Sequence, residues 1–252
     1  MTRPRAMATR NTPRAPSKRS WWRIATGIIM AMACLLILYQ LWLFCQVVYY
    51  NYQPPGRTSV MRQELSRLQE TRPNATLRYD WVNYDQISAS LKRAVISAED
   101  ANFLEHDGVE WEAIRKAWEY NQNQSELGRA KMRGGSTITQ QLAKNLFLSG
   151  SRTYLRKGQE LVLTFMIEHV MSKARILELY LNVAEWGTGV FGAQAAARHY
   201  YNTDARSLSA AQAARLAAML PNPRYYDVNR DTRYLNARTA VYLRRLRDAE
   251  IP

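Results

Sequence analysis

The pattern of hydrophobic positions divides the chain into two parts. Residues 24–48 contain no charged side chain, and this run is long enough for the roughly 20 apolar residues that a membrane-spanning helix needs. Beyond about residue 60, apolar residues recur with the helical period, and the alternation typical of strands is rare. The pattern therefore predicts one transmembrane helix followed by an all-α domain.

Six segments of the second part carry the helical period, and two of them begin with recognisable caps. Thr137 and Gln140 have the spacing of a capping box, as do Ser209 and Gln212. Pro221 ends the second of these two segments. The predicted helices are marked by Ile87, Leu91 and Val95, by Ile138, Leu142 and Leu146, and by residues 153–172, 174–184, 209–220 and 232–249.

Charge separates a basic tail from the rest of the chain. The formal net charge is +14, and residues 1–23 contain seven Lys or Arg and no acidic residue. The tail is rich in Pro and Thr and lacks an apolar period, so we expect it to be disordered. Since basic residues flanking a span stay in the cytoplasm, the part of the chain after the span is expected outside the cytoplasm. The predicted order is a cytoplasmic tail (1–23), a signal anchor (24–48), a linker (49–60) and an exported domain (61–252).

The apolar run has two other interpretations, a buried core helix and a cleaved signal peptide. A core helix normally carries a polar stripe, and a signal peptide has a shorter apolar region followed by a cleavage site of small residues. Trp21, Trp22 and Trp42 stand near the ends of the run, as in the aromatic belts of membrane spans. Both cysteines, Cys34 and Cys45, lie inside the run, so the exported domain contains no disulfide.

Glu99 is the first candidate for chemistry. Each step of four residues along a helix advances by about 40°, which puts Glu99 at the margin of the apolar stripe marked by Leu91 and Val95. A partly desolvated carboxylate accepts a proton near neutral pH. The alternative is an inert glutamate in solvent or in a salt bridge with Lys92 or Arg93, and this stretch alone favours the inert interpretation. Asp100 and His106 are expected to support the following turn by hydrogen bonds.

Two later stretches could handle negative charge. Gly134 and Gly135 lead into a helix N-terminus, whose free N–H groups and dipole attract anions, although such a start is equally common without a ligand. Arg156, Lys157 and Glu160 share one helix face, where a solvated salt bridge is the ordinary interpretation. With Arg152, they could instead form a basic cluster around a second carboxylate. No group of residues has the ligand spacing of a zinc site.

Five blocks in order resemble the peptidoglycan glycosyltransferase family. EDANFLEHDG, Glu99–Gly108, fits the pattern E-D-x-x-F-x-x-H-x-G, and GGSTITQQ, RKGQE, KARILELYLN and GAQAAARHYY match the later blocks, except that Tyr201 stands where Phe is expected. The blocks cover roughly residues 85–225. The S-x-x-K and K-T-G elements of a transpeptidase domain are absent from the sequence, so the chain resembles the monofunctional branch of the family.

The resemblance implies an all-α, lysozyme-like glycosyltransferase domain with two lobes, which polymerises lipid II at the inner membrane from the periplasmic side. It makes Glu99 the general base and Glu160 the residue that orients the leaving pyrophosphate. No cofactor is required, although a divalent cation (Mg or Mn) is compatible with a pyrophosphate. Expected partners are lipid II, the nascent glycan chain, and divisome or penicillin-binding proteins, with no nucleic acid. The implied substrate-binding residues are Ser136, Gln140, Gln141, Lys144, Arg152, Arg156 and Lys157, and the implied supports of the site are Asp100, Phe103, His106, Gly134, Gly135 and Asn182.

Two rival functions remain. A lytic transglycosylase or lysozyme-type hydrolase also uses a helix-borne glutamate, but as a general acid on finished glycan. Such an enzyme has no need for a basic, Gly-Gly-led block that neutralises pyrophosphate. A non-catalytic, membrane-anchored cell-wall scaffold is the second rival, and under that interpretation Glu99 would be dispensable.

Overall fold

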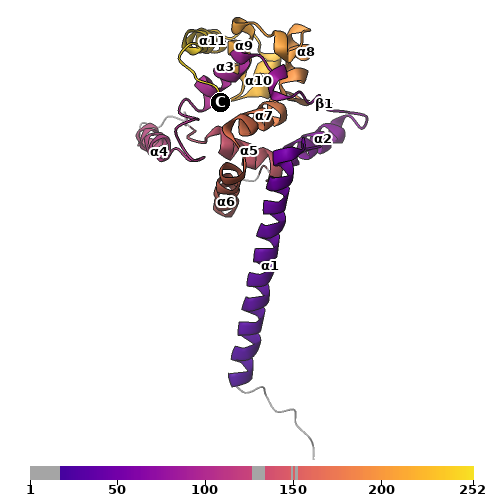
Figure 1. The fold of residues 1–252 in the computed structure, drawn as a ribbon, viewed down its shortest axis with the longest axis vertical. Coiled ribbons are helices and arrows are strands. Elements are labelled where there is room, and N and C mark those ends of the chain that lie inside the picture. Colours follow the sequence, from indigo (N-terminus) through magenta and orange to yellow (C-terminus); the bar gives the residue numbers. More distant parts are fainter. Residues whose placement is uncertain (1–17, 127–133, 149, 151–152) are drawn as a thin grey trace, which may run out of the picture. The chain divides into compact units, whose positions relative to one another are not determined.

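The computed structural model describes residues 18–126, 134–148, 150 and 153–252. Its contacts divide the chain into two units, residues 1–43 and 44–252. Most of the predicted tail lies outside the described residues. Figure 1 names the elements used below.

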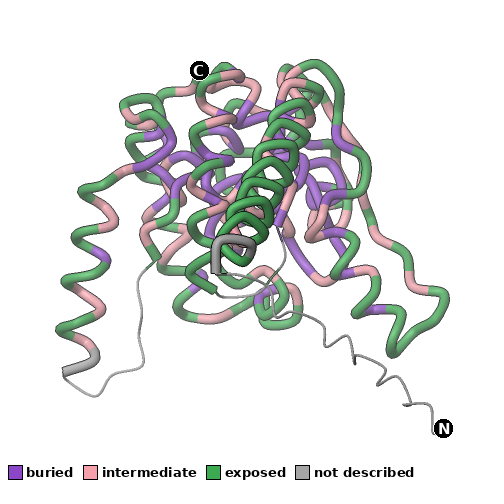
Figure 2. Tube along the Cα trace, turned by 90° about the horizontal axis from the view of Figure 1, so that it is seen from below, coloured by how far each residue is buried: buried purple, intermediate pink, exposed green. Residues whose placement is uncertain are grey.

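Helix α1 (Lys18–Tyr52) contains the predicted membrane span. Its apolar stretch runs from Trp21 to Tyr52, and the side chains of residues 21–42 are almost all exposed, as the green turns of the helix show (Figure 2). An exposed helix that is apolar on all sides requires an apolar solvent, which is consistent with a membrane anchor. The helix continues four residues into the predicted linker, because no helix-breaking residue occurs before Pro54.

Residues 44–252 form a helical domain with one small sheet. The long helices are α2 (Ser59–Thr71), α3 (Ala89–Glu99), α4 (Trp111–Glu126), α5 (Ile138–Phe147), α6 (Tyr154–Val170), α7 (Lys173–Val183), α8 (Ala193–Tyr201), α9 (Ala210–Met219) and α11 (Arg233–Arg245). The shorter elements are α10 (Pro223–Val228), η1 (Tyr84–Gln86), η2 (Ala205–Ser207), β1 (Arg78–Tyr79), β2 (Glu185–Gly187) and β3 (Val190–Phe191).

The helices pack in two groups. Helices α3, α9 and α11 contact one another, and α5 packs against α2, α6 and α7 (Figure 1). Helix α7 is buried continuously from Ile176 to Val183, and the fully buried Tyr180 belongs to it. A helix that is buried on every face forms the middle of a domain, and α7 takes that place here.

The sheet has the order β1-β3-β2, with β1 parallel and β2 antiparallel to β3. Gly189, in the turn between β2 and β3, has φ = 69°, a conformation that favours glycine. Strands of two or three residues are too short to show an alternating pattern, so the sequence did not predict them.

The predicted helices are found with small shifts at their ends. Both capping boxes form, that of Thr137 and Gln140 on α5 and that of Ser209 and Gln212 on α9. Ile87, expected within a helix, precedes α3, because Ser88 is the N-cap residue. Helices α2, α4, α8 and α10 were not predicted individually.

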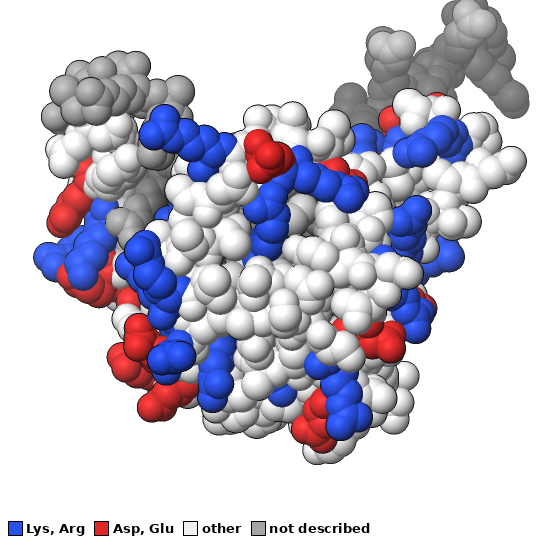
Figure 3. Space-filling model, turned by 90° about the horizontal axis from the view of Figure 1, so that it is seen from above, with Lys and Arg blue, Asp and Glu red and all other residues white. Residues whose placement is uncertain are grey.

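The helical domain contains more Lys and Arg residues than Asp and Glu residues. On the face drawn in Figure 3, Lys and Arg side chains lie mainly around the rim, while the middle carries few charged groups. Several acidic side chains are instead held inside, among them Glu64, Asp100 and Glu160. A buried carboxylate requires hydrogen-bond partners, and those of Asp100 and Glu160 define the site described next.

Candidate active site

Glu99 lies on the wall of a cavity of about 1010 Å³, at the C-terminal end of α3. The carboxylate is half-buried, as its place at the margin of the apolar stripe predicts. The wall combines the end of α3, the loop before α5, α4 and α11. It includes Ala98, Asp100, Asn102, Glu110, Lys116, Tyr120, Gly134, Gly135, Ser136, Gln141, Tyr234, Arg238, Tyr242 and Arg245.

Burial raises the pKa of the Glu99 carboxyl above its ordinary value. The hydrogen bond from Gln141 and the positive charges of Lys144 and Arg238 oppose this shift without cancelling it. Glu99 is thus a carboxyl group that holds its proton more firmly than usual and faces a cavity. This combination suits a residue that exchanges protons with a ligand.

A buried tyrosine orients the hydrogen-bond partner of Glu99. The Gln141 Nε2 group donates to Glu99 Oε2 over 2.8 Å, and Tyr180 Oη donates to Gln141 Oε1 over 3.1 Å. Tyr180 is 1% exposed, so its hydroxyl cannot turn to water. Because the hydroxyl occupies the oxygen end of the amide, the NH₂ end faces Glu99. Tyr180 therefore acts on Glu99 through Gln141.

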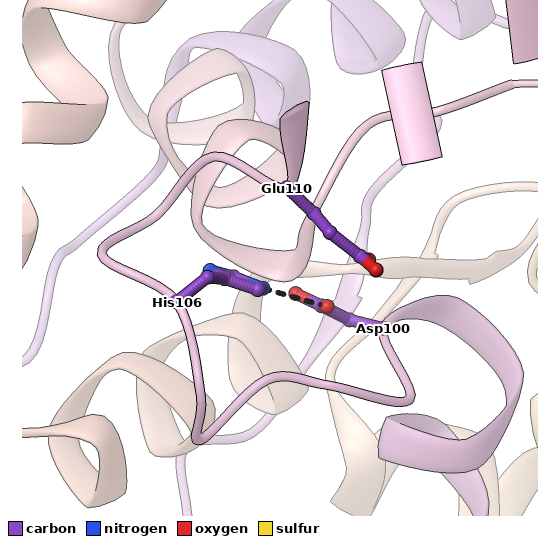
Figure 4. A group of neighbouring side chains, drawn as sticks. All are labelled: Asp100, His106 and Glu110. Atoms are coloured by element: carbon purple, nitrogen blue, oxygen red, sulfur yellow. Dashed lines mark hydrogen bonds and ion pairs between the residues drawn. The ribbon is translucent and has the colours of Figure 1, made fainter. Parts of the chain in front are cut away.

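Asp100 joins the end of α3 to the start of α5. One carboxylate oxygen pairs with His106 Nε2 at 2.8 Å, and the other accepts a hydrogen bond from the Ile138 backbone N–H at 3.0 Å. His106 Nδ1 in turn accepts from the Gly108 N–H, which fixes the turn between them. Figure 4 shows His106 and Asp100 pointing toward each other. These contacts tie the turn after α3 to the start of α5.

Replacing Asp100 with alanine is expected to destabilise the domain by about 2–4 kcal/mol. The Ile138 N–H would lose its partner inside the protein, which alone costs about 1–3 kcal/mol, and His106 would lose its carboxylate. Thermal unfolding of the detergent-solubilised chain measures the effect. The exposed Asp107→Ala in the same turn is the control. Equal stability of the two variants would contradict this role of Asp100.

Asp100, His106 and Glu110 are close enough together to suggest a metal site, which the sequence had not suggested. Their ligand atoms lie within 4.8 Å of one another. However, both Asp100 oxygens and the His106 nitrogens are already hydrogen-bonded, and Glu110 Oε1 accepts from Asn102 at 2.7 Å. The three side chains are therefore arranged as hydrogen-bonding partners that hold the turn after α3, and this arrangement fits a metal site less well.

The second carboxylate, Glu160, is buried and held by two cations from its own helix. Arg156 Nη1 donates to Glu160 Oε2 at 2.7 Å, and the Lys157 ammonium contacts Oε1. Lys157 Nζ also lies 3.3 Å from Ser136 Oγ, and Ser136 belongs to the cavity wall. We call Arg156, Lys157 and Glu160 the Glu160 cluster; it meets the cavity at Ser136.

The ammonium group of Lys144 is influenced by the charges of both carboxylates. Burial lowers the pKa of its ammonium group, while the charges of Glu160 and Glu99 both oppose that shift. Both carboxylates are thus within electrostatic reach of one half-buried ammonium. Glu99 and Glu160, far apart in the sequence, therefore act on the same lysine.

Other residues expected at the site have different surroundings. Gln140 is 2% exposed, completes the cap of α5 through Thr137 and is not among the residues that line the cavity. Asn182 hydrogen-bonds the backbone of Val82 and lies in the packing of α7. Phe103 is fully buried beneath the Lys173 ammonium. Arg152 lies outside the described residues.

One helix face at the cavity was not predicted to belong to the site. Tyr234, Arg238, Tyr242 and Arg245 of α11 all line the cavity. The Arg238 guanidinium lies 5.0 Å from the centre of the Tyr242 ring, and its charge acts on Glu99. Their spacing of four, four and three residues places them on one helix face. That spacing is the feature of the sequence from which this face could have been predicted.

Comparison with known proteins identifies the family. A model of the transglycosylase family matches residues 64–247. A Bordetella pertussis protein named biosynthetic peptidoglycan transglycosylase is 70% identical over 241 residues, covering 95% of this chain and 100% of its own length. Proteins of the same name from Herminiimonas arsenicoxydans and Methylobacillus flagellatus are 55% and 52% identical, over 89% and 93% of this chain and 96% and 99% of their own. With a family match over most of its length and relatives this similar, the chain belongs to the transglycosylase family.

Proposed function

We propose that the protein is a peptidoglycan glycosyltransferase of cell-wall biosynthesis that polymerises lipid II into β-1,4 glycan strands. The observation that carries the proposal is a carboxyl group of raised pKa, Glu99, on a cavity whose wall also meets the cations of the Glu160 cluster. A proton acceptor and a region for anionic groups are what transfer from a pyrophosphate-linked sugar requires. The relatives' names point to the same reaction.

Glu99 acts as the general base in this proposal. Its carboxylate takes the proton from the 4-hydroxyl of the acceptor sugar as that oxygen attacks the anomeric carbon of the donor. The new C–O bond forms as the bond from the anomeric carbon to the pyrophosphate oxygen breaks, with inversion from α to β. Undecaprenyl pyrophosphate leaves with the bonding electrons. Gln141 and Arg238 stabilise the ionised form of Glu99 that the step needs.

The positive groups stabilise the leaving pyrophosphate. Its negative charge grows as the bond breaks, and preorganised cations lower the energy of that transition state. Lys144, Arg156 and Lys157 are the candidates, and Glu160 holds the last two in place through its carboxylate. Ser136 offers a hydroxyl between these cations and the cavity.

A divalent cation does not fit at Glu160. One carboxylate oxygen is bonded to Arg156 and the other to Lys157, so neither is directed toward an open position. Divalent cations take carboxylate oxygens as ligands, and at Glu160 such an ion would have to displace Arg156 or Lys157. We therefore assign Glu160 no role as a metal ligand in the proposed reaction.

The anchor would keep the enzyme beside its lipid-linked substrate. We place the chain in the inner membrane, with the N-terminus in the cytoplasm and residues 61–252 in the periplasm, because of the basic residues before the span. Lipid II remains in the bilayer during polymerisation. A site tethered to that bilayer therefore meets substrate by two-dimensional diffusion.

The experiment that tests the proposal compares two substrates. The detergent-purified chain is incubated with fluorescent lipid II and, separately, with a finished glycan strand of known length. We expect polymer from lipid II and no shortening of the glycan. No polymer from lipid II, or shortening of the glycan as a lytic enzyme would produce, overturns the proposal.

Tyr180→Phe is expected to move the acid limb of the polymerisation rate to higher pH. Without the Tyr180 hydroxyl, the Gln141 amide is free to turn its oxygen toward Glu99, which favours the protonated carboxyl. Since Gln141 lowers the pKa of Glu99, losing its oriented NH₂ raises that pKa, and a higher pH is needed to ionise the base. The dependence of kcat/KM on pH measures this shift.

Tyr79→Phe is the matched control, because it also removes a hydroxyl that donates one hydrogen bond, to the Pro55 carbonyl, and Tyr79 is not on the cavity wall. Its acid limb should coincide with that of the wild type. Adding Tyr180→Phe to Gln141→Leu should cause no further shift, because the route through Gln141 is already lost. An additional shift in the double variant would show that Tyr180 acts by another route.

A further inference from the structure

A second cavity, of about 500 Å³, opens on a different part of the domain. It shares no lining residue with the cavity at Glu99. Its wall is formed by the end of α2, the loop before β1, the first residue of β1, the turn between β2 and β3, and α8. The lining residues are Leu68, Arg72, Pro73, Asn74, Ala75, Thr76, Arg78, Thr188, Gly189 and His199.

Asp227 organises the groups behind this cavity. Its Oδ1 atom accepts hydrogen bonds from His199 Nε2 at 2.8 Å and from Tyr200 Oη at 3.1 Å, while Oδ2 accepts from the Thr188 N–H at 3.0 Å. The Asp227 side chain is only 13% exposed. Gly187 leaves room for this contact, since a Cβ there would lie 2.5 Å from Tyr200 Oη. Asp227 is therefore held rigidly by α8 and the β2–β3 turn.

The bond to Asp227 determines which nitrogen of His199 carries the proton. Because Nε2 donates to the carboxylate, Nδ1 presents a lone pair, and Arg78 Nη1 lies 2.5 Å from it. An arginine has five N–H donors in a planar fork, so one bond to His199 leaves the others available. Asp227 and His199 thus fix a guanidinium at the wall of the second cavity.

The cavity is rich in donors and has no carboxylate among its lining residues. Within the described ranges, no acidic side chain forms an ion pair with Arg72 or Arg78, whereas neighbouring Arg198 pairs with Asp80 and Asp204. Thr188 adds a hydroxyl and Asn74 an amide. The apolar part of the wall comes from Leu68 and from the smaller Pro73, Ala75 and Gly189.

We propose that this second cavity, the Arg72–Arg78 pocket, is a binding site for the carboxylate of a short peptide with small side chains. Guanidinium groups pair with carboxylates through two parallel hydrogen bonds, and a preorganised guanidinium loses less entropy when it does so. The small apolar residues beside the arginines fit side chains such as methyl groups. A phosphate group shares the oxyanion chemistry but makes no use of the apolar wall.

The test measures binding to the full chain in detergent by titration calorimetry. The probes are N-acetyl-Ala-Ala, its C-terminal amide and inorganic phosphate. We expect saturable, one-to-one binding of the dipeptide, and binding at least tenfold weaker for the amide. Binding of phosphate without binding of the dipeptide would assign the pocket to another ligand and overturn the proposal, as would no binding of either.

Arg78→Gln and Arg72→Gln are each expected to weaken dipeptide binding roughly tenfold or more, because each removes a charged hydrogen-bond donor. Arg198→Gln removes one positive charge close to the pocket without changing its wall, and should bind as the wild type does. If all three variants weakened dipeptide binding equally, the weakening would reflect the loss of net positive charge and not the loss of a contact in the pocket. That result would overturn the proposal. Both pocket arginines are exposed, and thermal unfolding of each variant checks that it is folded.

His199→Phe tests the preorganisation separately. This variant keeps both arginines and a ring at the pocket wall, and it removes the imidazole nitrogens that contact Arg78 and Asp227. We expect weaker dipeptide binding than in the wild type, with saturation retained. Unchanged affinity would show that the Asp227–His199 pair only stabilises the fold. Because the readout is binding of a small probe, the result does not depend on polymerisation of lipid II.

Discussion

Glu99→Gln is expected to reduce polymerisation of lipid II by about 10²–10⁴-fold, the usual contribution of a general base. The amide has nearly the shape of the carboxyl group but accepts no proton from the acceptor hydroxyl. The same substitution is expected to raise the melting temperature at neutral pH. A loss of activity together with a gain of stability distinguishes a catalytic residue from a structural one.

The gain of stability follows from the raised pKa of Glu99. Between the unfolded and the folded pKa, the folded state holds more protons than the unfolded state, so the free energy of unfolding falls as the pH rises. Above the folded pKa the penalty of the buried charge is complete, and glutamine removes it. Glu99→Gln should therefore be more stable than the wild type at neutral pH, and the difference should shrink as the pH falls through that window.

Glu105→Gln is the control for this comparison, because Glu105 is exposed in the loop after α3 and is not on the cavity wall. It should retain both the activity and the melting temperature of the wild type. Full polymerisation by Glu99→Gln would remove the general base from the proposed mechanism. A lowered melting temperature in Glu99→Gln would instead mean that the carboxylate stabilises the fold.

Glu160→Gln is expected to lower polymerisation by about 10²–10³-fold, the usual cost of losing one preorganised charge-stabilising contact. Glutamine cannot hold Arg156 and Lys157 by charge, so both cations become free to leave their positions, that of Lys157 being beside Ser136. We also expect destabilisation by about 1–3 kcal/mol. This is less than for a fully buried ion pair, since the Arg156 and Lys157 side chains are 17% and 46% exposed.

Glu178→Gln provides a matched comparison. Glu178 is also a buried carboxylate paired with an arginine of its own helix, Arg175, at 2.5 Å, and it does not line the cavity. Its loss should destabilise the domain to a similar extent while leaving kcat largely intact. If the two variants lost activity in proportion to stability, the Glu160 cluster would have no specific part in the reaction.

Much of the fold could be predicted because it depends on local chemistry. The caps of α5 and α9 and the apolar faces of α3 and α6 are encoded by residues three or four apart. The expected all-α, lysozyme-like fold is confirmed by the helical structure and by the transglycosylase family match. The margin position of Glu99 also predicted its partial desolvation correctly, and burial is the main cause of its raised pKa.

The remainder depends on contacts between distant segments. Tyr180 reaches Glu99 only through Gln141, and Arg238 of α11 acts on Glu99 across the cavity. Periodicity identifies the buried face of a helix but not the helix that it meets, so neither contact could be predicted. Gln140 lies within a matching block, and its side chain completes the cap of its own helix, a local contact that the capping-box spacing does predict.

The dependence of kcat/KM on pH, with lipid II as substrate, tests the role of Glu99 most directly. A general base must be ionised, so the account predicts that activity falls on the acid side, with an apparent pKa above the ordinary 4.5 of a glutamate. A general acid of the lysozyme type must be protonated and would lose activity as the pH rises through the same range. That opposite slope, or a profile without an acid limb, would contradict the account.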